Sequence, residues 1–316
     1  MRLILFLSIF TATLVGCTQK ESPSQQEKGR SVSQSATIPQ LTVAILPTPD
    51  CLPFYIASQQ GIYDSLGLSV RTVIYPSQMD AEQSVIHGKS IGCATDLFRA
   101  TLLQSQKAPV RYIFSIDREW ELIANKKLRI SKISQLNDRV VGIARHSVTD
   151  YLSDYITTQM KTGQIILRPQ INNTDTRMQM LENSQIDAAF LPLPHALAAR
   201  RKGHTLLPFD DNKSKGFSGF AVSAKWTAAK ENKAKARLLQ KGYDIAVEKL
   251  QKGLKANLPA ADLQRFRLKG YETYIKTYRF TKASAPNNGK VETALKWLKD
   301  REAVSASFHT DTLLLK

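Results

Sequence analysis

The stretch LTVAILPTPDCLPFYIA, residues 41–57, contains the unit from which the rest of the chain is built. Its first six residues are mostly apolar and β-prone, which predicts a short buried strand. The turn PTPDC follows, Pro53 suits the first turn of a helix, and Gly61 marks the end of that helix. The stretch therefore predicts a strand, a turn and a helix in succession.

The same order recurs along the chain. Further strand and helix pairs are expected at 68–74 with 77–87, 91–94 with a helix opening at Thr95–Asp96, 140–144 with a helix running from Ser147 to Gly163, and 186–191 with 192–202. From Ala228 onward the pattern is mostly helical. Two blocks of alternating strands and helices, 41–114 and 137–207, predict an α/β fold with two lobes, each a mostly parallel sheet flanked by helices.

The first residues have the layout of an export signal. Arg2 supplies a positive charge, an apolar run follows, and small residues lead to the sequence LVGC at 14–17. This sequence resembles the lipobox of bacterial lipoproteins, which implies that residues 1–16 are a signal peptide and that Cys17 carries lipid. An ordinary secretory signal is the alternative. Polar residues 17–40 would then form the anchor and a flexible tether with a reach of about 25 Å, placing the protein in the cell envelope, in the periplasm or on the outer surface.

The net charge of +17 is large. Nucleic acid, an anionic membrane face, an anionic ligand and a merely solvated basic surface all fit such a charge. We favour the solvated surface, because the charges are scattered and no basic and aromatic nucleic-acid motif accompanies them. Cys51 and Cys93 are expected to be buried or cleft-lining thiols, with a disulfide as the alternative. The histidines have no metal-ligand spacing, so no metal and no cofactor are expected.

Polar turns follow the predicted strands at four places. These turns are 48–51, 94–96, 145–150 and 191–195. Ligands of open parallel sheets bind beyond the carboxyl ends of the strands, where helix amino termini present free N–H groups. Each polar residue there, taken alone, is more simply a helix cap, and Pro192 and Pro194 more simply begin a helix. Their joint placement in both lobes predicts a cleft in which some of them touch ligand.

Several motifs together resemble a known family. They are LPTPDCLPFYIA with GIYDSLGL at 46–68, HGKSIG at 87–92, SQLNDRVVGI at 134–143 and IDAAFLPLP at 186–194. In this order and spacing they resemble the NMT1/THI5-like substrate-binding proteins of ABC importers, a group that includes sulfonate, nitrate and thiamine-pyrimidine binders. Ser90 stands where the family has an aspartate, and no single motif is specific. The resemblance covers most of residues 41–225.

The resemblance implies a type II periplasmic-binding-protein fold with a two-strand hinge near 115–121 and 209–221. Lobe 1 would comprise 41–116 and 221–316, and lobe 2 would comprise 117–220. It also implies a monomer that delivers a small molecule to a permease and ATPase, without catalytic residues. The family's ligand contacts carry over to Asp50, Cys51, Thr95, Asp96, His146, Ser147, Thr149 and Pro192.

Two other functions fit the same scaffold. An enzyme could use Asp96 and His146 as acid and base, and a sensory or adhesion lipoprotein could use the same cleft. For the binding protein, the carboxylates Asp50, Asp96 and Asp150 favour a nitrogen heterocycle such as a thiamine pyrimidine precursor. Helix amino termini, Arg145 and the basic balance favour an anion such as a sulfonate or nitrate. Of the two, we favour the heterocycle.

Overall fold

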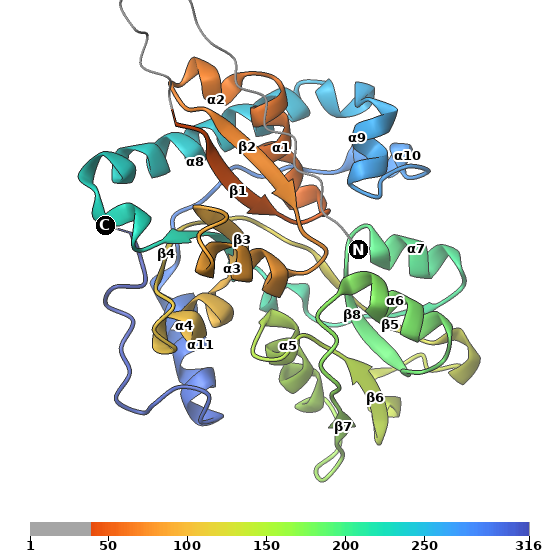
Figure 1. Cartoon of the computed structure of the whole chain (residues 1–316). Coiled ribbons are helices and arrows are strands. Elements are labelled where there is room, and N and C mark those ends of the chain that lie inside the picture. The colour runs from red at the N-terminus through yellow and green to blue at the C-terminus, as the bar shows by residue number, and fades with distance from the viewer. Residues whose placement is uncertain (1–38, 316) are drawn as a thin grey trace, which may run out of the picture. The chain divides into compact units, whose positions relative to one another are not determined.

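The computed structural model describes residues 39–315 (Figure 1). The expected signal peptide, Cys17 and nearly all of the tether lie outside these residues. These residues form one compact unit with its own hydrophobic core. Within the described part, no helix combines the length and the apolar character that a bilayer crossing requires.

The first sheet has five strands in the order β2-β1-β3-β10-β4. Their bounds are β1 Leu41–Ile45, β2 Val70–Ile74, β3 Gly92–Asp96, β4 Val110–Ser115 and β10 Ser218–Ser223. Strands β1, β2 and β3 are parallel, whereas β10 runs antiparallel to both β3 and β4. The strands predicted from the alternating pattern are therefore present, and the late strand returns between two early ones.

The second sheet has the order β7-β6-β8-β5-β9. Its strands are β5 Trp120–Ala124, β6 Arg139–Gly142, β7 Ile166–Leu167, β8 Ala188–Pro192 and β9 Thr205–Leu207. Strands β6, β7 and β8 are parallel, and β5 is antiparallel to β8 and β9. Strand β9 was not predicted from the sequence.

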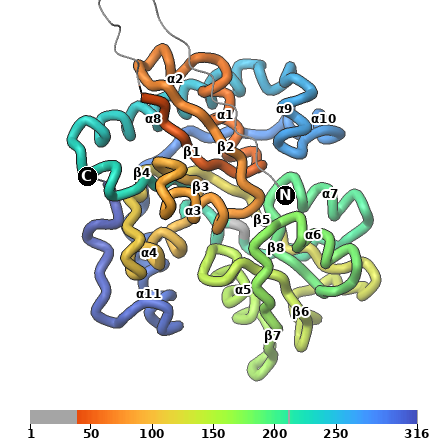
Figure 2. Tube along the Cα trace, viewed as in Figure 1, coloured from red at the N-terminus to blue at the C-terminus, as the bar shows by residue number. Residues whose placement is uncertain are grey.

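Two segments cross between the sheets, as Figure 2 shows along the chain. Residues 116–119 join β4 to β5, and residues 208–217 join β9 to β10. Each crossing involves the antiparallel strand of a sheet, β5 or β10. We call the part built on the first sheet lobe 1 and the part built on the second sheet lobe 2. This arrangement confirms the α/β periplasmic-binding-protein fold with a two-strand connection.

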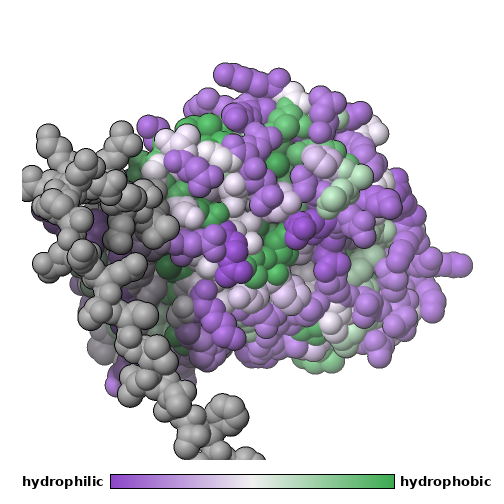
Figure 3. All heavy atoms as spheres, turned by 45° about the horizontal axis from the view of Figure 1, so that its top comes forward, coloured by the Kyte–Doolittle hydropathy of each residue, from purple (hydrophilic) through white to green (hydrophobic). Residues whose placement is uncertain are grey.

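Helices cover both sheets. Those of lobe 1 are α1 Leu52–Gln59, α2 Ile62–Ser65, α3 Gln78–Ile86, α4 Leu97–Ser105, α8 Lys230–Gln251, α9 Ala260–Arg265, α10 Glu272–Thr277 and α11 Asn288–Asp300, and those of lobe 2 are α5 Val148–Thr157, α6 Thr174–Glu182 and α7 His195–Arg201. Helix α8 lies very close to α2, because a Cβ at Gly242 would be 2.3 Å from the Tyr63 ring. Hydrophilic residues cover most of the face in Figure 3, with hydrophobic residues in small patches.

Two predicted helix bounds are wrong. Helix α5 ends at Thr157 rather than at Gly163. The helix expected from Pro192 begins instead at His195, because Pro192 is the last residue of β8 and pairs with Trp120 of β5. The proline therefore ends a strand and does not begin the helix, which places its ring at the carboxyl edge of the second sheet.

An aromatic cluster forms the core of lobe 1. Phe54 lies 4.8 Å, between ring centroids, from both Phe220 and Tyr243, and 5.9 Å from Phe114. All four rings are buried, and burying each contributes roughly 2–3 kcal/mol to folding. Because Phe54 belongs to α1 and Tyr243 to α8, the cluster fixes the turn before α1, which is one wall of the site described next.

Candidate ligand-binding cavity

A cavity lies between the lobes at the carboxyl edges of both sheets, where the sequence predicted a cleft. Its walls come from both lobes and from the segment between them. The lining residues of lobe 1 are Leu46, Pro47, Thr48, Pro76, Ser77 and Gln78, with Arg267 from the segment after α9. Those of lobe 2 are Ala144, Ser147, Asn172, Thr174, Asp175, Arg177, Pro192 and His195, and the first crossing and the start of β5 add Arg118 and Trp120. Its volume of about 40 Å³ accommodates roughly three water molecules. The site is therefore nearly closed and small.

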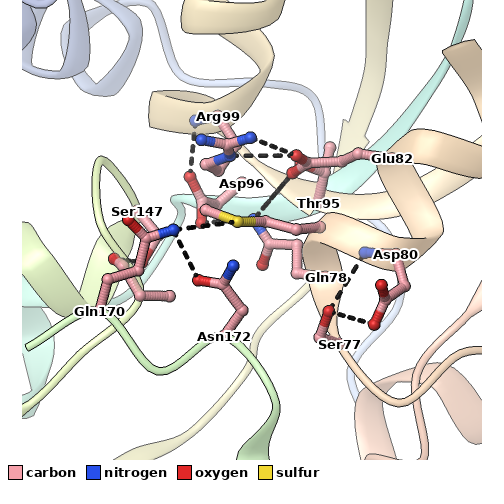
Figure 4. Close-up of polar contacts among 12 residues, drawn as sticks. Ser77, Gln78, Asp80, Glu82, Thr95, Asp96, Arg99, Ser147, Gln170 and Asn172 are labelled. Carbon is pink, nitrogen blue, oxygen red and sulfur yellow. Dashed lines mark hydrogen bonds and ion pairs between the residues drawn. The ribbon is translucent and has the colours of Figure 1, made fainter.

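Gln78 organises the lobe 1 side of the cavity. Its amide nitrogen donates to Asp96 Oδ2 at 2.8 Å, and also lies 3.3 Å from Glu82 Oε1 and 3.4 Å from Thr95 Oγ1. Figure 4 shows these side chains gathered between α3 and the start of α4, with Arg99 donating two hydrogen bonds to Glu82 Oε2 at 3.0 and 2.8 Å. The network fixes the Gln78 side chain at the cavity wall.

Asp96 belongs to this network and also connects the two lobes. Its carboxylate caps α4 by accepting from the Arg99 N–H at 2.9 Å, and Oδ2 also accepts from the Val148 N–H of lobe 2 at 3.3 Å. Burial raises the pKa of Asp96, although its hydrogen bonds oppose the shift. Asp96 is fully buried, so it acts as a cap and an interlobe contact.

A buried ion pair connects the first turn of lobe 1 to the crossing segment. Arg118 donates from Nε and Nη2 to Asp50 Oδ2 at 3.1 and 2.9 Å, and both side chains are 2 % exposed. Burial alone would lower the pKa of Arg118, but the adjacent Asp50 carboxylate outweighs it and raises that pKa above its ordinary value. The Arg118 side chain lines the cavity with its charge already neutralised.

Arg177 supplies a positive charge without an ionic partner in the described part of the chain. Its guanidinium is bonded to two backbone carbonyls, Ile171 O at 3.1 and 2.6 Å and Phe190 O at 2.7 Å. Burial lowers the pKa of Arg177 to about 10, so the group remains charged at neutral pH. A buried charge of this kind favours an anion nearby.

Three residues close the cavity from the other side. Asp175 Oδ1 lies 2.8 Å from His195 Nε2, and Asp175 Oδ2 accepts from Arg267. Asp175 and His195 belong to lobe 2, whereas Arg267 follows α9, which is held to lobe 1 by a 2.7 Å hydrogen bond from Tyr55 to Asp262. Arg267 has a left-handed backbone with φ +59°, an uncommon conformation for a residue with a side chain. The contact therefore bridges the lobes at the cavity.

Three buried polar atoms that belong to lining residues have no hydrogen-bond partner among the described atoms. They are Thr48 Oγ1, Trp120 Nε1 and His195 Nδ1. An unmade hydrogen bond at a buried group costs about 1–3 kcal/mol, so these atoms mark where a ligand would be held. The Trp120 N–H can only donate, and the Thr48 hydroxyl can donate or accept. His195 Nε2 donates to the Asp175 carboxylate, so Nδ1 donates only when the imidazole is doubly protonated. The set suits a ligand rich in acceptors.

Replacing Trp120 by Phe tests this assignment, because it removes the N–H and keeps most of the ring. We expect the affinity for a small anion, with nitrate as the probe, to fall by about 10- to 150-fold, since a hydrogen bond to a charged group contributes about 1.5–3 kcal/mol. The unfolding temperature should not fall. Trp226→Phe is the control, because Trp226 does not line the cavity. Calorimetry showing equal losses in both variants would contradict the assignment.

The Asp175 bridge should make stability depend on pH. The hydrogen bond from His195, and then the charges of His195 and Arg267, hold the pKa of Asp175 below its usual value. The stabilisation is therefore complete above the unfolded value of about 3.9 and is lost as pH falls through the lower folded pKa. Urea unfolding at pH 6 should give wild type a larger free energy of unfolding than Asp175→Asn. The difference between the two free energies should be smaller at pH 3. A constant difference would contradict this.

The structure brings some of the predicted ligand contacts to the cavity and not others. Ser147 and Pro192 line it, and Asp50 lies behind Arg118. Cys51, Thr95, Asp96, His146 and Thr149 are not among its lining residues. Their roles in the structure are different. Thr95 donates to Glu82 at 2.8 Å, and Thr149 Oγ1 accepts from the Ala144 N–H at 2.9 Å.

The two cysteines and His146 do not line the cavity. Cys51 and Cys93 are free and buried, which confirms buried thiols rather than a disulfide. Burial, and then the Asp50 charge, raise the pKa of Cys51 to about 12. His146 has a left-handed backbone with φ +55°, and its N–H donates to Asp150 at 2.8 Å. This bond positions the start of α5, whose cap Ser147 lines the site.

Sequence reasoning missed most of the polar wall. Gln78, Arg118, Trp120, Asp175, Arg177, His195 and Arg267 were not predicted as ligand contacts. His195 stands in one of the four polar turns, and Arg118 and Trp120 lie in the hinge expected near 115–121. The described residues contain no group of three or more His, Cys, Asp or Glu side chains that could hold a metal ion, and no lining residue suggests an organic cofactor.

Two lobes joined by two crossing segments around a nearly closed cavity define the architecture of periplasmic binding proteins. The chain belongs to the NMT1/THI5-like family, whose family model matches residues 48–251. No curated protein matches the chain in sequence.

Solved structures support the fold. The alkanesulfonate-binding protein SsuA from Xanthomonas axonopodis pv. citri bound to MOPS is 12 % identical with a TM-score of 0.69, over 88 % of this chain and 98 % of that one. The periplasmic nitrate-binding protein NrtA from Synechocystis PCC 6803 is 13 % identical with a TM-score of 0.68, over 87 % and 84 %. The periplasmic aliphatic sulphonate binding protein SsuA from Escherichia coli is 14 % identical with a TM-score of 0.66, over 84 % and 93 %.

Proposed function

We propose that this protein is the solute-binding component of an ABC-type importer and that its ligand is a small anion. The observation that carries the proposal is the buried Arg177 charge, which has no ionic partner in the described part of the chain and lies at the wall of an interlobe cavity. The unpartnered atoms of Thr48, Trp120 and His195 at the same cavity supply the remaining ligand contacts.

An anion is favoured over the nitrogen heterocycle that the carboxylates suggested. Asp50 is neutralised by Arg118, and Asp96 is fully buried in a cap. Asp150 is buried and accepts from the His146 N–H, so none of these three carboxylates offers its charge to a ligand. A volume of about 40 Å³, room for roughly three water molecules, suits a compact ligand such as an oxyanion or a small anionic head group. The solved structures that resemble this chain include a nitrate-binding protein and two sulfonate-binding proteins, and this agrees with an anionic ligand.

Ligand capture would proceed by closure of the lobes about the crossings at 116–119 and 208–217. The interlobe contacts described above stabilise the closed form, together with Asp154 of α5, which accepts from Trp297 Nε1 at 2.7 Å and from Arg301 Nε at 2.9 Å. A ligand that bridges both walls adds differential affinity for the closed form and shifts the population toward it. The permease would recognise the closed form of a monomeric binding protein.

The binding protein would work in the cell envelope, held to a membrane by lipid on Cys17. The signal-like layout of residues 1–16, the lipobox-like LVGC and the polar composition of residues 18–40 support this location. Mass spectrometry of protein extracted from membranes tests it, since the first residue should be an acylated Cys17.

Turnover is not part of the proposal. The acid and base pair considered from the sequence would be Asp96 and His146, but Asp96 is fully buried and neither residue lines the cavity. A substrate in the cavity would therefore meet neither group. A sensory role would use the same cavity and would differ only in the partner.

A thermal-shift panel tests the ligand class. Nitrate, methanesulfonate and a neutral pyrimidine are added to purified protein, after unfolding and refolding to remove retained solute. A ligand at 100 times its dissociation constant stabilises the folded state by about 2.7 kcal/mol. We expect stabilisation by at least one anion and none by the pyrimidine. Stabilisation by the pyrimidine alone would overturn the anion assignment.

A further inference from the structure

A second hollow lies at the edge of the first sheet opposite the ligand cavity. Its volume is about 420 Å³, and it is lined by Val85, Ile86, His87, Gly88, Lys107, Ala108, Pro109, Val110, Ser223 and Lys225. These residues come from the end of α3, the turn after α4, the start of β4 and the end of β10. The lining includes two lysines and a histidine and no acidic residue.

The basic character continues onto the first turns of α8. Lys230, Lys233 and Arg237 are exposed, and they follow one another at helical spacing on one face. No ion pair to these three residues, or to Lys107 or Lys225, occurs within residues 39–315. Glu231 is the acidic residue of this helical turn. We call the surface formed by His87, Lys107, Lys225, Lys230, Lys233 and Arg237 the basic end.

An apolar side chain lies within the basic end. Ile86 lines the hollow and is 41 % exposed, so an apolar side chain stands among the cations of this surface. Cations around an exposed apolar residue are the combination that interfacial membrane surfaces use, because head groups attract the charges while the apolar side chain enters the boundary.

The chain enters the described structure at the same edge. Three consecutive backbone hydrogen bonds link the neighbouring strands there, from Ile91 N to Thr42 O at 2.8 Å, from Ser223 N to Ile91 O at 2.8 Å and from Ala224 N to Pro109 O at 3.0 Å. Thr42 is the second residue of β1, and Ser223 and Pro109 belong to or adjoin the hollow. The first described residues, 39–41, therefore lie at the same edge as the basic end.

We propose that the basic end docks on the surface of an anionic phospholipid membrane. The charge, the exposed Ile86 and the position of the first described residues at this edge all favour a bilayer over a free anion. A free anion would need a few converging groups in a closed site. The inference goes beyond solute binding. Because the ligand cavity is at the opposite edge of the first sheet, membrane contact and ligand capture would use different surfaces.

Vesicle sedimentation tests the proposal with the chain from Thr18 to Lys316, which lacks the lipid and contains the whole compact unit. We expect binding to vesicles of phosphatidylglycerol and phosphatidylcholine, no binding to pure phosphatidylcholine, and loss of binding in 0.5 M salt. Changing Lys107, Lys225, Lys230 and Lys233 to Gln should weaken binding at least tenfold. Changing Lys127, Lys132, Lys161 and Lys276, which are exposed elsewhere, to Gln is the matched control.

Several outcomes would overturn the proposal. Equal losses in the two quadruple variants would mean that only net charge matters, and equal binding to both vesicle types would exclude the anionic head groups. Displacement from vesicles by 10 mM inorganic phosphate at constant ionic strength would indicate a free-anion site. Nitrate calorimetry on the same preparations separates this test from the proposed function, because both quadruple variants should bind nitrate as wild type does.

Discussion

Replacing Arg118 by Met is expected to lower the free energy of unfolding by about 3–5 kcal/mol, because it leaves a buried carboxylate without its partner. Arg118 and Asp50 are each 2 % exposed, and the two hydrogen bonds between them are 3.1 and 2.9 Å long. The ion pair joins the turn after β1 to the first crossing segment. The loss should therefore also loosen the wall of the cavity, and nitrate affinity should fall with stability.

The Asp50→Asn/Arg118→Met double variant separates the two effects. It removes both charges, so most of the lost stability should return, as seen generally when a buried ion pair is replaced rather than broken. Arg301→Met is the matched control, because its partner Asp154 is 30 % exposed and such pairs contribute about 1 kcal/mol or less. Urea unfolding followed by circular dichroism measures all three. If Arg118→Met and Arg301→Met lowered the free energy of unfolding equally, the claim that burial strengthens the Arg118–Asp50 contribution would be contradicted.

Replacing Arg177 by Met is expected to weaken nitrate binding about 100-fold or more. A unit charge about 5–6 Å from a bound anion, at an effective dielectric constant of about 20, contributes about 3 kcal/mol. Arg177 is 1 % exposed and has only backbone carbonyls as hydrogen-bond partners in the described part of the chain. The ligand would thus be the only counter-charge that this guanidinium meets.

Arg177→Lys is the control for charge. It keeps the cation but loses the planar group that bonds Ile171 O and Phe190 O, so it should retain more affinity than the Met variant. Unfolding midpoints establish that both variants are folded. A folded Arg177→Met protein that binds nitrate as tightly as wild type would remove the main support for an anionic ligand.

The fold could be predicted from the sequence because its signals are local. The stretch at 41–57 and its later counterparts display strand, turn and helix within a few residues, and the caps Ser77, Asp96 and Ser147 stand where the helices begin. Strand β9 and the place of β10 between β3 and β4 depend on pairing between distant segments. No local pattern encodes such pairing.

The site was harder to predict, for a physical reason. The sequence-based ligand contacts were residues at polar turns. Turn residues such as Asp96 and Thr149 instead accept hydrogen bonds from backbone N–H groups near the starts of helices. The cavity instead uses side chains on crossing segments and inside helices, such as Arg118 and Arg177. Arg267 comes from a segment with no motif at all, and only the packing of α9 on lobe 1 brings it to Asp175.

The most direct test of an interlobe anion site is a crystal structure of the protein with bromide, located by its anomalous scattering. We predict a bromide peak in the cavity, within hydrogen-bond distance of Trp120 Nε1 and His195 Nδ1, and its loss when nitrate is added in excess. A neutral or cationic molecule occupying that cavity, with bromide bound only on the outer surface, would contradict the proposed function.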